Sequence, residues 1–245
     1  MPRFLSTISL LFSTFLLVLF PQFNAGSKTS ALRDKVTTPQ FSSINIDSIA
    51  LQETVNILYD SLKLQKCGLK KEAFAFAFKG YSTLLQKRRI NKEGLLTICD
   101  FSQSSRRKRL YLIDLVNYKI LLNTHVAHGK NSGGEYARKF SNRPESLQSS
   151  LGFYVTKRTY WGEHGLALVI DGLEKGFNDK AEKRRIVVHG SKYVGDRSIN
   201  GRSFGCPAIP KKYSSKLINT IKNGSLLFIY HPSKNYLTGS TILNG

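Results

Sequence analysis

Short strand-like segments dominate the chain from residue 95 onward, and this feature most restricts the fold. They are rich in β-branched and aromatic residues and are separated by Gly, Asn, Asp or Ser. The segments are 95–99, 110–115, 120–126, 151–156, 166–170, 186–189 and 226–230. In this half, only residues 213–222 have a helical pattern. The sequence therefore predicts a mostly β domain, a sandwich or a barrel, over residues 91–245.

A small helical segment is expected before this domain, over residues 45–90. Leucine and valine side chains share one face of a first helix, at Leu51, Val55, Leu58 and Leu62. Gly68 is a suitable stop signal. The stretch 69–86 is ambiguous, because its alternating phenylalanines fit a strand while Phe74, Phe78 and Tyr81 fit one helical face. The surrounding Ala, Lys, Glu and Gln residues favour a helix there.

The amino-terminal residues have the layout of a secretory signal peptide. Arg3 is followed by an uncharged, mostly apolar run over 4–20, which is too short to cross a membrane comfortably. We therefore expect residues 1–25 to be a signal peptide and 26–44, rich in Ser and Thr, to be a flexible lead-in. An uncleaved amino-terminal anchor is the alternative. The expected location is the periplasm or cell envelope.

Positive charge is in large excess. The 37 Lys and Arg residues outnumber the 16 Asp and Glu residues, which gives a net charge of +21. Such a charge favours anionic partners, and in a cell envelope these are wall polymers and lipid headgroups. Export argues against nucleic acid as the partner. The basic run 106–109 is either a solvated turn or a patch that grips an anionic surface.

Two residues late in the chain could form a nucleophile pair. His189 ends a predicted strand, and Cys206 follows 17 residues later between Gly205 and Pro207. A cysteine reacts as the thiolate, which a nearby histidine base can generate. However, a cysteine is often only a small buried hydrophobe. Spacing alone leaves both interpretations open.

In sequence, this region resembles the catalytic domain of the L,D-transpeptidases, the YkuD-like family that cross-links the cell wall. The family has His-Gly and then Ser-x-Gly-Cys after a comparable gap. The closest similarity is to its divergent murein L,D-transpeptidase branch. Further matching segments, in order, are 100–102, 109–115, 126–130, 149–154, 171–178 and 201–207. The resemblance covers roughly residues 45–232.

The resemblance implies a cysteine acyltransferase that acts on peptidoglycan tetrapeptide stems. Cys206 would be the nucleophile and His189 the catalytic base. The carbonyl of Gly190 would orient the imidazole, and the amides of Gly205 and Cys206 would stabilise the oxyanion. Ser203 belongs to the same motif. A second stem as acceptor gives a 3–3 cross-link, water makes the protein an L,D-carboxypeptidase, and a lipoprotein amine gives an anchored lipoprotein.

Two positions depart from the wider family. Phe204 replaces a usual His, and Ala208 replaces a usual Arg two places after the cysteine. Arg202 is a candidate substitute for that arginine and, like Tyr154 and His128, a candidate substrate contact. The departures support an alternative function, an inactive module that binds the wall through its charge. Charge alone would also fit an exported protein that binds nucleic acid or membrane.

No metal or other cofactor is expected, since thiol acyl transfer requires neither. His125 and His128 would supply half of a zinc site at most, and no H-E-x-x-H motif is present. A phosphate-cradling loop is also absent.

Other residues leave choices open. His164 is either loop surface or part of the site rim, and Trp161 is expected to pack rather than to stack on a glycan. Cys67 and Cys99 could pair in an oxidising compartment. The oligomeric state is not indicated.

Overall fold

The computed structural model describes residues 46–196 and 199–245. The predicted signal peptide and lead-in lie outside these ranges. Within them, no helix has the length and apolarity that crossing a membrane requires. The described residues belong to one compact unit that spans residues 43–245.

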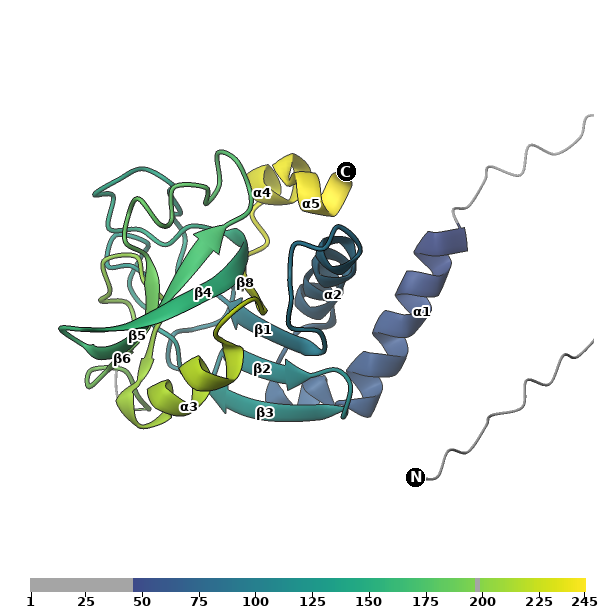
Figure 1. Cartoon of the computed structure of the whole chain (residues 1–245), viewed down its shortest axis with the longest axis horizontal. Helices are drawn as coiled ribbons and strands as arrows, with labels where there is room; N and C mark the ends of the chain where they lie inside the picture. The colour runs from purple at the N-terminus through teal and green to yellow at the C-terminus, as the bar shows by residue number, and fades with distance from the viewer. Residues whose placement is uncertain (1–45, 197–198) are drawn as a thin grey trace, which may run out of the picture. The chain divides into compact units, whose positions relative to one another are not determined.

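One mixed sheet forms the framework (Figure 1). Its eight strands are β1 (Leu95–Asp100), β2 (Leu110–Asp114), β3 (Lys119–Thr124), β4 (Gly152–Gly162), β5 (Gly165–Gly172), β6 (Val187–Ser191), β7 (Ala208–Pro210) and β8 (Leu226–Tyr230). Their order is β3-β2-β1-β8-β4-β5-β6-β7. The β1–β8 and β6–β7 pairs are parallel and the other neighbours are antiparallel. The predicted mostly β class is confirmed.

The two edges of the sheet approach each other. After β3 the chain continues to Ala127, which pairs with Ala208 of the opposite edge strand β7. Two residues later, Gly129 pairs with Ser203. These bridges curl the sheet into a near-barrel, and they place the loop before β7 at the closure.

Helices cover the sheet from both ends of the described chain. They are α1 (Ile46–Ser61), the short 3₁₀ helix η1 (Leu64–Cys67), α2 (Lys71–Gln86), α3 (Lys211–Ile221), α4 (Lys234–Gly239) and α5 (Thr241–Asn244). Helix α2 contacts β1, β8 and α5 (Figure 1). Side chains of α1 and α2 belong to the same buried cluster as those of the sheet. The helical segment and the β region therefore share a hydrophobic core.

A glycine in α2 allows a close contact between this helix and the sheet. A Cβ atom at Gly80 would lie 2.1 Å from the ring of Phe153 on β4. That ring stacks on Phe228 of β8, with centroids 4.1 Å apart. The ring of Phe153 thus occupies space that any side chain at position 80 would need.

Most predicted elements are present. The ambiguous stretch 69–86 forms a helix, as its composition indicates, and all seven predicted strands exist. Gly68 ends η1 with φ of 82°, a conformation that favours glycine. The prediction that only 213–222 is helical in the second half is wrong, because α4 and α5 follow β8. The three-residue strand β7 was not predicted.

Candidate active site

Strand β6 holds His189 at the concave closure of the sheet. His189 pairs with Ala167 of β5 and Ala208 of β7, and 5% of its surface is exposed. Its Nδ1 lies 3.1 Å from the carbonyl oxygen of Gly190, so Nδ1 carries the proton and donates it. Nε2 is then the nitrogen available as a base. Burial lowers the pKa of His189, which keeps the imidazole neutral near pH 7.

Cys206 lies in the loop before β7, beside Val187, the first residue of β6. Its Sγ accepts a hydrogen bond from the Val187 amide at 3.4 Å and lies 3.8 Å from the Arg185 carbonyl oxygen. It packs against Val187, which is two residues from His189 and therefore on the same face of β6. Burial raises the pKa of the thiol, so Cys206 rests protonated and needs a base.

The described contacts include no hydrogen bond between Sγ and the imidazole. Catalytic hydrogen bonds are often long before substrate binds and shorten in the complex. The Cys206 thiol thus lies against the backbone of β6 at Val187, two residues before His189.

The backbone at Gly205 requires glycine. Its φ is 118°, and a Cβ atom there would lie 2.8 Å from the Gln148 carbonyl oxygen. The Gly205 amide donates a hydrogen bond to Ser203 Oγ at 3.3 Å. The loop itself therefore engages the Gly205 amide. The oxyanion role of the Gly205 and Cys206 amides stays a prediction.

Two predicted upstream elements converge on this loop. The Ser203 amide donates to the carbonyl of His128, and the Lys130 amide donates to the carbonyl of Ser203 at 2.7 Å. Ser149 Oγ accepts from the Gly129 amide and lies 3.4 Å from the Gly205 carbonyl oxygen. Segments 126–130 and 149–154, which resemble the family, therefore contact the loop that carries Cys206.

Arg184 is a site residue that the sequence did not indicate. Its guanidinium donates to Ser141 O, Ser150 Oγ, Ser146 Oγ and Gln148 O, at 2.6–3.2 Å. A Cβ atom on Gly205 would lie 3.2 Å from Nη2 of Arg184. The positive charge acts on Cys206 and opposes the effect of burial on the thiol pKa. Arg184 therefore clamps the 141–150 loop and supplies a cation beside the nucleophile.

The structure shows the surroundings of Ala208 and Phe204, the two positions that depart from the family, and of Arg202. Ala208 is fully buried in β7 opposite His189, where no arginine side chain fits. Arg202 is exposed, and its charge lowers the pKa of Tyr193 against the opposing effect of burial. Arg184 is the guanidinium that acts on Cys206. Phe204 is 66% exposed, and the Lys130 ammonium lies 4.6 Å from its ring centroid.

The β4–β5 hairpin adds His164 to the site. Its ring stacks on that of His189, with centroids 4.5 Å apart and an interplanar angle of 21°. The other side of His164 is exposed, so it belongs to the rim of the site. Trp161, on the same hairpin, is 81% exposed, so of the expected core or loop packing the core is excluded.

Two predicted substrate contacts are wrong because they are buried. Tyr154 has no exposed surface, and its hydroxyl group bonds with Ser150. His128 is also fully buried, between the Arg109 guanidinium (2.7 Å from Nδ1) and the Gly133 carbonyl oxygen (3.1 Å from Nε2). Both side chains are therefore part of the buried interior and cannot touch a substrate.

The remaining cysteines are free thiols. Cys99 is buried in β1, which raises its pKa to about 12, and Cys67 ends η1. In the part of the chain that the structure describes, no three His, Cys, Asp or Glu side chains gather as metal ligands.

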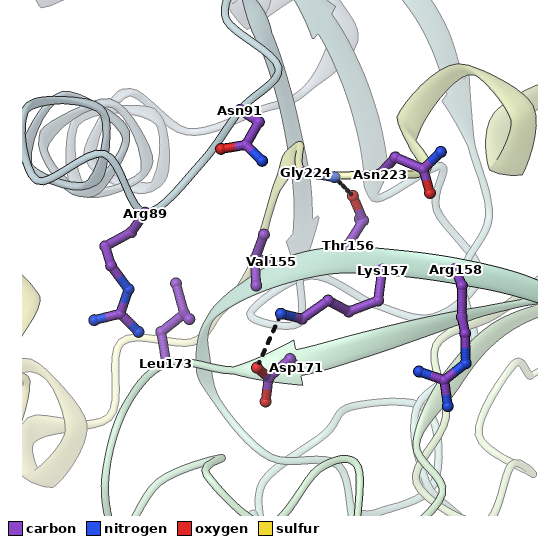
Figure 2. A pocket seen from close by; sticks show the side chains of 10 residues that line it. All are labelled: Arg89, Asn91, Val155, Thr156, Lys157, Arg158, Asp171, Leu173, Asn223 and Gly224. Atoms are coloured by element: carbon purple, nitrogen blue, oxygen red, sulfur yellow. Dashed lines mark hydrogen bonds and ion pairs between the residues drawn. The ribbon is translucent and has the colours of Figure 1, made fainter.

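A cavity of about 450 Å³ lies elsewhere on β4 and β5, and it is lined by neither Cys206 nor His189 (Figure 2). Lys157 points across it to Asp171, with 3.5 Å between Nζ and Oδ2. Arg158 pairs with Glu182 at 3.7 Å. Carboxylates thus already partner the two strand cations of this cavity.

Comparison with known proteins shows which family this chain is similar to. A family model described as "L,D-transpeptidase catalytic domain" matches residues 65–230. This range contains β1 to β8, both His189 and Cys206, and the Arg184 clamp. No curated protein matches the sequence.

Several solved structures are similar at low sequence identity. An L,D-transpeptidase from Mycobacterium smegmatis is 11% identical over 56% of this chain and 59% of its own, with a TM-score of 0.36. The helical cell shape determining protein Pgp2 from Campylobacter jejuni is 16% identical over 65% and 56%, with a TM-score of 0.35. An L,D-transpeptidase from Xylanimonas cellulosilytica is 15% identical over 75% and 93%, with a TM-score of 0.34. The chain thus spans less than two thirds of the length of the first two.

Proposed function

Because the chain belongs to the L,D-transpeptidase catalytic-domain family, we propose that it is an exported cysteine acyltransferase of peptidoglycan stem peptides. Cys206 is the nucleophile and His189 the base. The observation that carries the proposal is that the Cys206 Sγ accepts from the amide of Val187, two residues before His189 on β6, while Nδ1 of His189 is bound to Gly190 and Nε2 is available.

Acylation begins with transfer of the Cys206 proton to Nε2 of His189. The thiolate attacks the carbonyl carbon at the L-centre of the diamino acid in a tetrapeptide stem. The Cys206 amide stabilises the oxyanion that forms. Collapse of the intermediate breaks the peptide bond to the terminal D-alanine, and His189 returns the proton to the departing amine. The product is a thioester on Cys206.

The second half of the reaction transfers the acyl group. An amine of another stem attacks the thioester carbon, gives its proton to His189, and releases the Cys206 thiol. The product is a 3–3 cross-link. Water as the acceptor yields a tripeptide, and a lipoprotein amine yields an anchored lipoprotein. The exposed rim with His164, Trp161 and Phe204 is where an acceptor stem can approach.

Export and charge fit this substrate. The apolar run near the amino terminus is typical of a signal peptide, and the net charge of +21 favours the anionic polymers of an envelope. Peptidoglycan is therefore the proposed partner, and no cofactor takes part.

Incubation with a disaccharide-tetrapeptide tests the proposal, with products separated by chromatography and identified by mass. We expect release of D-alanine together with dimers or tripeptides, which name the acceptor. Cys206→Ala should release none. If the wild-type protein leaves the tetrapeptide uncleaved but binds peptidoglycan, the protein is instead an inactive wall-binding module.

A further inference from the structure

A second hollow on the surface is lined by lysines and lies next to the catalytic strand. Its volume is about 430 Å³. Its lining includes Ser191 at the end of β6 and Pro210 at the end of β7, which pair with each other. Ser191 is two residues beyond His189, roughly 7 Å along the strand. The hollow is thus separate from Cys206 but built on the same strand pair.

Four lysines from three distant segments border this hollow, which we call the lysine pocket. They are Lys108, Lys192, Lys211 and Lys212. Lys108 belongs to the basic run 106–109, in which Arg109 is buried and Arg106 pairs with Glu135. The fold therefore gathers lysines from separate segments of the chain around this hollow. The proposed catalytic mechanism does not use them.

These lysines lack acidic partners. Among the described residues, none of the four forms an ion pair. The one acid at the pocket, Asp196, lies 3.4 Å from His125 Nδ1 and is 73% exposed. By contrast, Lys157 and Arg158 in the cavity of Figure 2 both have carboxylate partners. Four like charges around one hollow repel each other unless an anion joins them.

The pocket chemistry suits a compact, multiply charged anion. Lysine ammonium groups act as point charges that bind phosphate, whereas flat carboxylates are matched best by the planar fork of arginine. Among the residues that the structure describes, which leave out 197 and 198 beside Asp196, no arginine lines the pocket. Helix α3 begins there at Lys211, with no side-chain cap and no acid in its first turn, so its amino-terminal dipole adds to the positive potential.

We propose that the lysine pocket is a binding site for the phosphate group of an anionic ligand. The site is independent of the thiol chemistry at Cys206. A hollow of this size fits a discrete phosphate-bearing group, and Lys108, Lys192, Lys211 and Lys212 all line it. The Lys212 ammonium lies 4.9 Å from the ring centroid of Tyr213, which also lines the hollow.

Titration of the full chain with inorganic phosphate tests the proposal, at constant ionic strength maintained with chloride. Isothermal calorimetry reports the affinity. We expect saturable binding that weakens about tenfold or more in the triple variant Lys192→Gln, Lys211→Gln, Lys212→Gln, because three charge-assisted contacts are lost. Circular dichroism would verify that this variant is folded, as expected for exposed side chains.

The matched control removes the same number of charges elsewhere. Lys70, Lys79 and Lys87 are exposed and lie outside the pocket. Their replacement by Gln should leave phosphate affinity within about twofold of the wild type, since distant exposed charges are screened by salt. Equal weakening in both triple variants, or no saturable binding by the wild type, would overturn the proposal.

Vesicles separate the two sources of a phosphate group. Binding to vesicles with phosphatidylglycerol, lost in the pocket variant but not in the control, would identify a lipid headgroup. Phosphate binding by the pocket without such vesicle binding would identify a soluble phosphate ligand. Both results support the site, and neither depends on Cys206 being active.

Discussion

At the residue scale, Arg184 supplies a positive charge near Cys206, where the usual arginine of the family is replaced by Ala208. Ala208 is buried where the family usually has arginine, yet a buried thiol with a raised pKa benefits from a nearby cation. Arg184 reaches the nucleophile loop from the segment before β6, and its four hydrogen bonds fix its orientation. The cation thus comes from another part of the chain.

Replacement of Arg184 by Gln should make Cys206 less reactive. Without the positive charge, the pKa of the thiol rises further and less thiolate exists at neutral pH. We expect iodoacetamide alkylation of Cys206 to slow by about threefold to tenfold at pH 7. Peptide mass spectrometry across a pH series measures it.

The exposed Arg158, which pairs only with Glu182, provides the control for that experiment. Arg158→Gln should keep the wild-type alkylation profile. An unchanged profile in Arg184→Gln would show that this guanidinium does not act on the thiol.

His164 is a positioning residue for the base, because its ring stacks on His189 from the rim. Burial lowers the pKa of His189, and the charge of His164 lowers it further. Removal of that charge in His164→Ala should raise the pKa of His189. The acidic limb of the acylation rate then moves to higher pH, measured with the tetrapeptide under single-turnover conditions.

A second variant separates charge from stacking. His164→Phe keeps an aromatic ring over His189 but no charge, so it should share the pH shift of His164→Ala while it retains more of the plateau rate. Wild-type pH profiles in both variants would exclude a role for His164 at the base.

At the scale of elements, Gly80 decides how closely α2 approaches the sheet. Alanine favours a helix over glycine by up to about 1 kcal/mol. However, its methyl group would overlap the ring of Phe153, which is held by the stack on Phe228. Overpacking costs typically 1–3 kcal/mol, so we expect Gly80→Ala to destabilise the protein by about 1–2 kcal/mol. Urea unfolding followed by circular dichroism measures it.

Gly134 offers a comparison, because a Cβ atom there meets no other atom within 4 Å. Gly134→Ala should change the free energy of unfolding little. Greater stability of Gly80→Ala than of the wild type would mean that α2 moves away from Phe153 without cost.

Elements of ordinary length could be predicted from the sequence, whereas the shortest could not. Five or more residues with β-branched and aromatic side chains suffice to indicate a strand, but β7 has three residues and begins in a Gly- and Pro-containing loop. Helix α5 has four residues, too few for a periodic pattern. The parallel pairing of β1 with β8 joins segments 130 residues apart and leaves no local signal.

Some residues of the candidate site could be predicted from the sequence, and others could not. Cys206 and His189 carry a motif, so the sequence indicated them. Arg184 and the stacking of His164 depend on loops that meet only in the folded chain. Tyr154 and His128 lie in the correct segments, but sequence position did not reveal that their side chains point inward.

At the scale of the whole molecule, a buried polar network links the barrel closure to the rest of the core. The Arg109 guanidinium, fully buried, donates to the carbonyls of Gln103 and Val126 and to His128. His128 must therefore be neutral, with Nδ1 accepting. Burial and the charge of Arg109 lower the pKa of His128 from 6.5 to about 4.

This pKa makes global stability depend on pH. Between pH 6.5 and about 4 only the unfolded chain holds a proton on His128, so acidification favours unfolding. The stabilisation is present above pH 6.5 and is lost as the pH falls toward 4, by at most about 3 kcal/mol. Urea unfolding at a series of pH values measures the loss.

His128→Gln isolates this contribution. Glutamine can accept from Arg109 but cannot be protonated, so the variant should lose less stability between pH 6.5 and 4 than the wild type. If both proteins lose the same amount, His128 does not control the acid sensitivity.

The most direct test of the central claim is the intact mass of the protein after brief incubation with disaccharide-tetrapeptide, followed by peptide mapping. We expect a thioester adduct on Cys206, with loss of D-alanine from the substrate. His189→Asn should slow its formation by about a hundredfold or more, and Cys206→Ala should form none. An adduct on Cys67 or Cys99, or an adduct that persists in Cys206→Ala, would contradict the assignment of Cys206 as the nucleophile.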